Sequence, residues 1–237
     1  MLRNKYIRQC AVAPLRRYAP VHFFPILPHN YAVCTRNMKL NIKALTYNFL
    51  IDPLLSGLRK AVAKEISGSD MVIDIACGTG ALATELAHRA GHVTGIDLDE
   101  SLISFAQSRA EKKGISNVDF RVHDASNLSI YTENEFDIAV TSMAIHQFPE
   151  DLAVKILIEM KRIAGKVVIA DYNCPMPRSL SGSVAFGIER IARGDHYRNF
   201  RNYMSKGGLT WFADRAGLTI RSRTINGNGV FVVAGCE

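Results

Sequence analysis

The sequence lacks the features that mark several large classes of protein. None of its apolar runs approaches the roughly 18 residues that a membrane-spanning helix needs, so any membrane contact is expected to be peripheral. Its five cysteines are odd in number, scattered and without a C-x-x-C pair. That pattern favours neither a disulfide framework nor a cysteine-based zinc site, and it suits a reducing compartment. We therefore expect a cytoplasmic protein, and the sequence identifies no metal ligands.

Acidic residues are missing from residues 1–37, although this stretch holds six lysines and arginines. It also contains four prolines and no sustained periodicity, which argues against a packed element. An arginine-rich, acid-free start resembles a transit peptide for the mitochondrial matrix, but transit peptides are usually rich in serine and the first serine is Ser56. The alternative, which we favour, is that translation begins at Met38. In either case we expect the basic residues 1–37 to lie outside the fold and residues 38–237 to form one domain.

Periodic patterns follow from residue 71 onward. Short β-branched runs alternate with helical segments, which predicts a mostly parallel sheet covered by helices. The predicted strands are residues 71–76, 92–97, 118–123, 136–143 and 166–171. Glycine permits the left-handed backbone that closes a helix, and four helices are predicted to end in this way, at Gly91, Gly114, Gly165 and Gly217.

The end of the chain departs from this alternation. Residues 218–225 and 229–235 are strand-like and separated by Asn-Gly-Asn, which predicts an antiparallel hairpin. Before them, residues 175–208 are longer than a plain crossover needs. We expect them to form a helical lid near the site, because extra segments beyond the carboxyl ends of strands tend to carry substrate contacts.

A glycine-rich turn follows the first predicted strand. Gly78, Gly80 and Ala83 satisfy G-x-G-x-x-A, and Asp97 ends the second strand, which by itself is compatible with a nicotinamide dinucleotide site. Asp74, however, stands inside the first strand, where a carboxylate repels a pyrophosphate and attracts an ammonium group. Asp124 follows the third strand at the same edge, where it can accept a hydrogen bond from an adenine amino group. The acids therefore favour S-adenosylmethionine.

With these motifs in place, the sequence resembles the class I S-adenosylmethionine-dependent methyltransferases. The resemblance covers roughly residues 44–236, where "VIDIACGTG", "VTGIDLD", "VHDASNL" and "FDIAVTSMAIHQF" correspond in turn to the first four conserved blocks of the family. It implies an α/β fold with a Rossmann-like, doubly wound sheet of seven strands, mostly parallel with an antiparallel C-terminal hairpin strand. Residues 47–62 also resemble the N-terminal region of ubiquinone and menaquinone biosynthesis C-methyltransferases, by whose analogy Tyr47 would close over the cofactor.

The resemblance implies two groups of cofactor-binding residues. Four would surround the methionine part: Asp74, Ala76, Gly78 and Gly80. The two glycines are expected because a Cβ would collide with the ligand, and Ala76 replaces the first glycine of the commonest motif. The rest would hold the nucleoside and the methyl group: Asp97 at the ribose hydroxyls, Leu98 against the adenine, Asp124 and Ala125 at its edge, and Ser142 with Met143 beside the methyl.

The implied reaction is methyl transfer to oxygen, carbon or nitrogen of a small-molecule acceptor, by in-line displacement. His146 is the first candidate for a base if the acceptor loses a proton, because the pKa of histidine lies near neutrality. It could equally pack or orient a loop. Tyr172 is the second catalytic candidate, and it could line the acceptor pocket or pack in the lid, as could His196 with Tyr197.

The acceptor class is less defined by the sequence. The predicted lid carries an excess of basic residues, which suits an anionic acceptor or a solvated helix face. A quinone- or phenol-like acceptor is compatible too. DNA is disfavoured, because the fourth block reads "TSMAIH" in place of an Asn- or Asp-Pro-Pro-aromatic sequence. An NAD(P)-binding Rossmann oxidoreductase and a non-catalytic protein that binds the cofactor stay open as alternatives.

Overall fold

The computed structural model describes residues 55–237, so the predicted leader, Tyr47 and the first part of the segment 47–62 lie outside the described residues. Seven strands form one sheet: β1 (Met71–Ile75), β2 (His92–Asp97), β3 (Val118–Val122), β4 (Phe136–Ser142), β5 (Ala164–Tyr172), β6 (Ile220–Asn226) and β7 (Phe231–Cys236). Every strand boundary lies within two residues of its prediction. The alternation of β-branched runs therefore located the whole sheet.

The sheet has the strand order β3-β2-β1-β4-β5-β7-β6. Its first five strands are parallel, and β7 inserts antiparallel between β5 and β6. The predicted mostly parallel, doubly wound fold with an antiparallel C-terminal hairpin is confirmed. From β1 the chain adds β2 and β3 outward on one side of the sheet. It then returns to the centre and adds β4 and β5 on the other side, so the direction in which strands are added changes between β1 and β4. Ligands of open α/β sheets bind at such a switch point, beyond the carboxyl ends of the strands.

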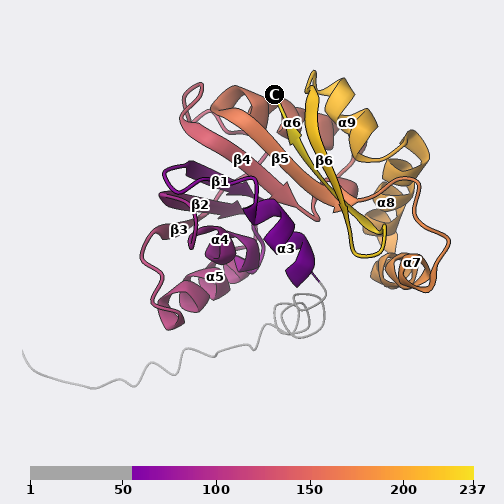
Figure 1. Cartoon of the computed structure of the whole chain (residues 1–237), viewed down its shortest axis with the longest axis horizontal. Helices are drawn as coiled ribbons and strands as arrows, with labels where there is room; N and C mark the ends of the chain where they lie inside the picture. The colour runs from indigo at the N-terminus through magenta and orange to yellow at the C-terminus, as the bar shows by residue number, and fades with distance from the viewer. Residues whose placement is uncertain (1–54) are drawn as a thin grey trace, which may run out of the picture. The chain divides into compact units, whose positions relative to one another are not determined.

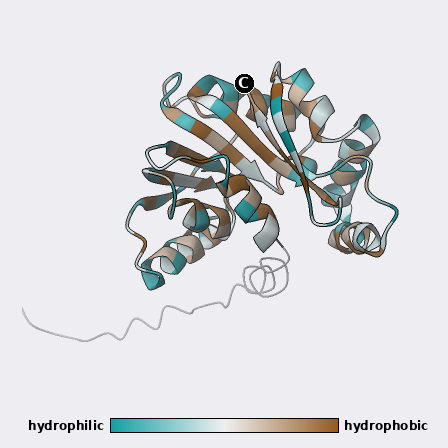
Figure 2. Cartoon of the chain, in the orientation of Figure 1, coloured by the Kyte–Doolittle hydropathy of each residue, from teal (hydrophilic) through white to brown (hydrophobic). Residues whose placement is uncertain are grey.

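Helices cover both faces of the sheet (Figure 1). One face carries α3 (Ser56–Ala63), α4 (Ala81–Leu86) and α5 (Glu100–Lys112), and the other carries α6 (Glu150–Ile163) and α9 (Leu209–Arg215). The central strands are the most hydrophobic elements (Figure 2), as expected for strands that are buried on both faces. Their side chains form the core together with the inward faces of the helices.

Two of the four predicted helix-ending glycines adopt the left-handed conformation, Gly114 at φ +65° and Gly217 at φ +68°. The prediction is wrong for the other two. Gly165 lies inside β5, because α6 passes directly into that strand. Gly91 has no positive φ, but a Cβ there would lie 2.9 Å from the carbonyl oxygen of Ser69. Close packing, and not backbone conformation, therefore explains Gly91.

The segment 175–208 contains α7 (Leu180–Ala192) and α8 (Gly194–Lys206). Ser179 caps α7 by accepting a hydrogen bond from the amide of Gly182. Helix α8 packs against the 3-10 turn η2 (Ile145–Gln147), where the Asn199 side chain donates to the carbonyl of Gln147 at 2.7 Å. The two helices therefore cover the loop that leaves β4.

Candidate active site

A cavity of about 400 Å³ lies beyond the carboxyl ends of β1, β2, β3 and β4, at the switch point. Its polar edge comes from the turns that follow these strands, and its apolar wall comes from the helices beside them. Eight of the ten predicted cofactor-binding residues line it: Ala76, Gly78, Asp97, Leu98, Asp124, Ala125, Ser142 and Met143. The motifs that lie far apart in the sequence therefore meet in one place.

The turn after β1 is held in an unusual backbone conformation. Ala76, Gly78 and Gly80 have φ values of +59°, +53° and +67°. A left-handed alanine costs roughly 1–2 kcal/mol relative to an ordinary conformation, which explains why glycine is the commoner residue at the position of Ala76. Met143, which lines the cavity at the end of β4, is also left-handed at φ +56°. Strained residues of this kind gather at functional sites.

Three amides of this turn donate hydrogen bonds within the protein. Gly78 donates its N–H to Oδ2 of Asp97 at 2.9 Å. Cys77 donates to the carbonyl of Ile96, and Gly80 to the carbonyl of Cys77, each at 2.9 Å. A dinucleotide-binding turn presents such amides to a pyrophosphate. Here a carboxylate already occupies the amide of Gly78, so the turn is poorly suited to an anion.

Asp97 is fixed at the end of β2 by two backbone donors. Its Oδ2 accepts from Gly78, and its Oδ1 accepts from the amide of Asp99 at 2.9 Å. Each carboxylate oxygen can accept more than one hydrogen bond. The side chain is half-buried and lines the cavity, so both oxygens can still receive the two hydroxyl groups of a ribose.

Asp74 lies in the middle of the sheet, beneath the turn, and does not itself line the cavity. Its carboxylate is buried, and in the described part of the chain its Oδ2 has no hydrogen-bond partner. Burial, followed by the negative charge of Asp97, raises the pKa of Asp74 to about 8. A positively charged ligand in the cavity would favour its ionised form. Its role in holding an ammonium group stays a prediction.

Glycine is required at position 80 for a different reason from the predicted one. The prediction places Gly80 against the ligand, but the residue does not line the cavity. A Cβ on Gly80 would lie 2.6 Å from the Cβ of Ala106 and 2.8 Å from the ring of Phe120. Gly80 therefore lets α4 pack closely against α5 and β3. For Gly78 a Cβ would meet nothing within 4 Å among residues 55–237, which leaves its surface open to a ligand on that side.

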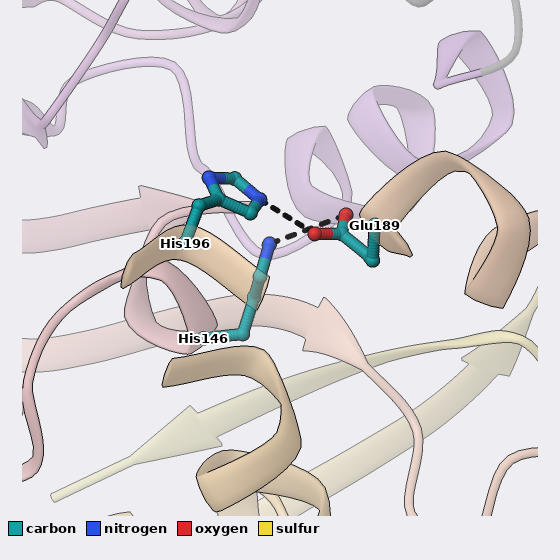
Figure 3. A group of neighbouring side chains, drawn as sticks. All are labelled: His146, Glu189 and His196. Atoms are coloured by element: carbon teal, nitrogen blue, oxygen red, sulfur yellow. Dashed lines mark hydrogen bonds and ion pairs between the residues drawn. The ribbon is translucent and has the colours of Figure 1, made fainter. Parts of the chain in front are cut away.

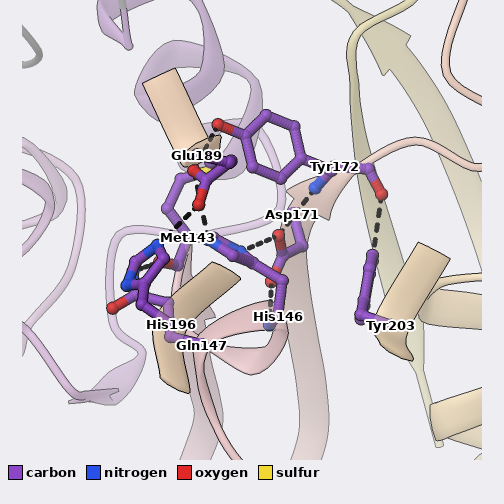
Figure 4. A network of polar contacts seen from close by, with 8 residues as sticks. All are labelled: Met143, His146, Gln147, Asp171, Tyr172, Glu189, His196 and Tyr203. Carbon is purple, nitrogen blue, oxygen red and sulfur yellow. Dashed lines mark hydrogen bonds and ion pairs between the residues drawn. The ribbon is translucent and has the colours of Figure 1, made fainter. Parts of the chain in front are cut away.

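His146 and Tyr172, the two predicted catalytic residues, lie outside the cavity in a buried polar network (Figure 4). Nδ1 of His146 lies 2.6 Å from Oδ1 of Asp171. The Tyr172 hydroxyl donates to Oε1 of Glu189 at 2.8 Å. Both side chains are more than nine-tenths buried. Neither side chain lines the cavity, so each can influence a reaction there only through other groups.

Charge pairing dominates this network. Burial lowers the pKa of His146, but the carboxylates of Asp171 and Glu189 raise it by more, to about 9. Burial raises the pKa of Glu189, whereas its contacts with His146, His196 and Tyr172 bring it below the usual range. Nε2 of His146 lies 3.5 Å from Oε1 of Glu189, an ion pair without a hydrogen bond.

The predicted lid does not line the cavity: none of residues 175–208, all of which the structure describes, is among its wall residues. His196 belongs to the buried network, and Tyr197 lines a separate hollow beside α7. Much of the actual wall was not predicted from the sequence: Leu55 and Arg59 from the start of the described chain, Leu102 from α5, Gln147 and Phe148 after β4, and Leu152 with Ile156 from α6. The apolar residues among these look like ordinary core positions in a single sequence.

The hydrogen-bond acceptors around the cavity suit S-adenosylmethionine. Asp97 and Asp124 on the cavity wall supply acceptor oxygens for hydroxyl and amino groups, and beneath the turn Asp74 has a buried carboxyl oxygen with no hydrogen bond among the described residues. Asp124 is poised by its hydrogen bond from the amide of Ser126 at 2.8 Å, which lowers its pKa. Acceptors arranged in this way match a ligand with positive charge and many hydrogen-bond donors.

Curated relatives include a ubiquinone biosynthesis O-methyltransferase from Pseudomonas fluorescens (strain Pf0-1), which is 27% identical over 153 residues, 63% of this chain and 65% of that protein. A ubiquinone/menaquinone biosynthesis C-methyltransferase from Rhizobium meliloti is 31% identical over 107 residues, 43% of this chain and 41% of that protein. The chain thus spans less than two thirds of the length of the first of these relatives.

Solved structures agree on the fold. A SAM-dependent methyltransferase from Aquifex aeolicus superposes with a TM-score of 0.60 at 17% identity, covering 82% of this chain and 96% of that one. Magnesium protoporphyrin IX methyltransferase from Synechocystis, crystallised with bound SAH, superposes with a TM-score of 0.52 at 17% identity, covering 82% of each chain. A family model described as a methyltransferase domain matches residues 66–208, more than half of the sequence. This chain therefore belongs to the methyltransferase domain family, within the class I S-adenosylmethionine-dependent methyltransferases.

Proposed function

We propose that this protein transfers the methyl group of S-adenosylmethionine to a small-molecule acceptor. The observation that carries the proposal is the hydrogen bond from the Gly78 amide to the Asp97 carboxylate. It engages one of the amide donors that a dinucleotide-binding turn presents to a phosphate. With Asp124 on the same wall and Asp74 beneath, the acids favour a cationic donor over a phosphorylated one.

Each part of the cavity has a role in this proposal. Asp97 accepts the ribose hydroxyls, Leu98 packs on the adenine, and Asp124 with Ala125 contacts the adenine edge. Ser142 and Met143, at the end of β4, lie beside the position of the methyl group. S-adenosylmethionine supplies a methyl group that is already activated by a sulfonium. The protein mainly has to align donor and acceptor, which can contribute about 7–11 kcal/mol of barrier reduction.

The acceptor is proposed to be an aromatic molecule of the phenol or quinol class. Support comes from the apolar wall formed by Phe148, Leu152 and Ile156 and from the quinone-pathway names of the relatives. Aromatic and aliphatic walls of this kind typically bury most of the surface of a small ligand. No helix in the described part of the chain is long and apolar enough to cross a membrane.

The direct test is transfer of a labelled methyl group. The full chain is incubated with methyl-labelled S-adenosylmethionine and a panel of catechols, phenols and hydroquinones, and products are identified by mass spectrometry. Wild type is expected to label at least one aromatic acceptor. Labelling of none, with the cofactor still bound, would favour a non-catalytic role for the fold.

A pair of variants ties the result to the site. Asp97→Ala removes both ribose acceptors, and hydrogen bonds to a charged group are worth about 1.5–3 kcal/mol each. We expect the affinity for S-adenosylmethionine to fall by at least about 100-fold, because 1.4 kcal/mol corresponds to a factor of ten. Asp214→Ala, which changes an exposed acid on α9, is the matched control and should bind as wild type does.

A further inference from the structure

Three side chains with metal-binding atoms meet away from the cavity: His146, Glu189 and His196 (Figure 3). They come from η2, α7 and α8, three elements that are separate in sequence. Both imidazole rings point at the Glu189 carboxylate. Their candidate ligand atoms all lie within 4.8 Å of one another. The fold, and not a local sequence motif, brings this donor set together.

The geometry is close to that of a tetrahedral metal site. Nε2 of His146 lies 3.5 Å from Oε1 of Glu189. Bonds of about 2.0–2.1 Å to a tetrahedral zinc ion place neighbouring donor atoms about 3.3–3.4 Å apart. Nε2 of His196 and Oε2 of Glu189 are closer, at 2.5 Å, and would need to separate. His196 can move, because about a third of its side chain is exposed.

One ring nitrogen in this cluster has no hydrogen bond. Nε2 of His146 is fully buried and has no hydrogen bond among the described residues, because its ion-pair contact with the Glu189 carboxylate, at 3.5 Å, is too long for one. Buried polar atoms are nearly always satisfied, so each exception needs an explanation such as an ion. A metal ion bound at this nitrogen would satisfy it.

The surroundings supply the support that metal-binding histidines usually have. Nδ1 of His146 faces Asp171 at 2.6 Å, the carboxylate–histidine arrangement that orients a metal ligand. Glu189 is held by the hydroxyl of Tyr172 at 2.8 Å. A divalent ion would also balance the charges of the two buried carboxylates, Asp171 and Glu189.

We propose that His146, Glu189 and His196 bind one divalent transition-metal ion of the zinc type. Two histidines and one glutamate form a known zinc ligand set, with a fourth position for water. The ion would fasten α7 and α8 to η2, the turn that follows β4. The proposal does not rest on methyl transfer, because the three ligands lie outside the cavity wall.

Cobalt is a useful probe, because Co²⁺ in a tetrahedral site absorbs visible light whereas Zn²⁺ does not. The full chain is stripped of metal with a chelator and titrated with CoCl2, and Zn²⁺ is then added in competition. Wild type should bind one Co²⁺ with a tetrahedral spectrum, and Zn²⁺ should displace it. Loss of a residue that supports a metal ligand typically lowers metal affinity by about 10- to 100-fold. His196→Ala removes a ligand itself, so it should lower the affinity for Co²⁺ by at least about 100-fold.

His88→Ala is the matched control, because His88 is exposed and lies outside the cluster. It should keep wild-type affinity and spectrum. Equal Co²⁺ affinity and spectra in wild type and His196→Ala would overturn the proposal and leave a network held by hydrogen bonds alone. If His196→Ala fails to fold, X-ray absorption of the zinc-loaded wild type decides. Nitrogen and oxygen neighbours only are expected, and sulfur neighbours would assign the zinc to cysteine and refute the site.

Discussion

Replacing Asp74 by asparagine should stabilise the protein without cofactor. Burial and the charge of Asp97 raise the pKa of Asp74 from 3.8 to about 8. A group whose pKa is raised in the folded state contributes stability below its unfolded pKa, and this stability is lost as the pH rises toward the folded pKa. At about 1.4 kcal/mol per pKa unit, the interval from 3.8 to pH 7 sets an upper bound of roughly 4 kcal/mol. Asparagine, which does not ionise, avoids this cost.

The assay is urea unfolding of wild type and Asp74→Asn in the absence of cofactor, at several values from about pH 5 to pH 8. The variant should be the more stable protein at neutral pH. Its advantage should grow with pH by up to about 1.4 kcal/mol per unit. Asp214→Asn, at an exposed acid on α9, should show no such trend. A difference that does not change with pH, or a variant that is less stable at neutral pH, would refute the reasoning.

The same substitution should have the opposite effect on ligand binding. S-adenosylmethionine carries positive charge, so its binding should favour ionised Asp74 and release a proton near neutral pH. Calorimetry in buffers of different ionisation enthalpy measures that proton. We expect release of up to one proton by wild type and less by Asp74→Asn, together with weaker binding by the variant. Equal proton release by both proteins would show that Asp74 does not ionise when the cofactor binds.

Three further substitutions probe the backbone and the packing around the site by urea unfolding. Ala76→Gly should stabilise the folded protein by less than about 1–2 kcal/mol, because it removes the strain of a left-handed alanine. A clear loss of stability would mean that the backbone at φ +59° carries no strain. Gly80→Ala should destabilise by about 1–3 kcal/mol or more, because its Cβ meets the ring of Phe120; wild-type stability would contradict the packing described. Tyr203→Phe should cost about 1 kcal/mol by removing a buried hydrogen bond of 2.9 Å to the Tyr172 carbonyl, and an unchanged midpoint would argue against that bond.

The fold was predictable because its signals are local. Alternating β-branched runs located all seven strands, and the Asn-Gly-Asn connection identified the hairpin. The cofactor edge was predictable for a related reason. Gly78, Asp97 and Asp124 each lie at or just after the end of a parallel strand, and the carboxyl ends of neighbouring parallel strands meet at one edge.

What the sequence could not show depends on contacts between distant segments. The clash that requires glycine at position 80 involves Phe120, forty residues away. The network around His146 takes Asp171 from β5 and Glu189 from α7, and neither has a motif that points to the other. A histidine near the end of a strand gives no sign of being buried. Its place outside the cavity emerges only from the packing of α8 on η2.

The central claim is that the acids around the glycine turn select a cationic nucleoside donor over a phosphorylated dinucleotide. Titration calorimetry of the wild-type chain with S-adenosylmethionine and, separately, with NAD tests it most directly. The account predicts saturable binding of S-adenosylmethionine and no measurable binding of NAD at the same concentrations. Binding of NAD with equal or higher affinity would contradict it.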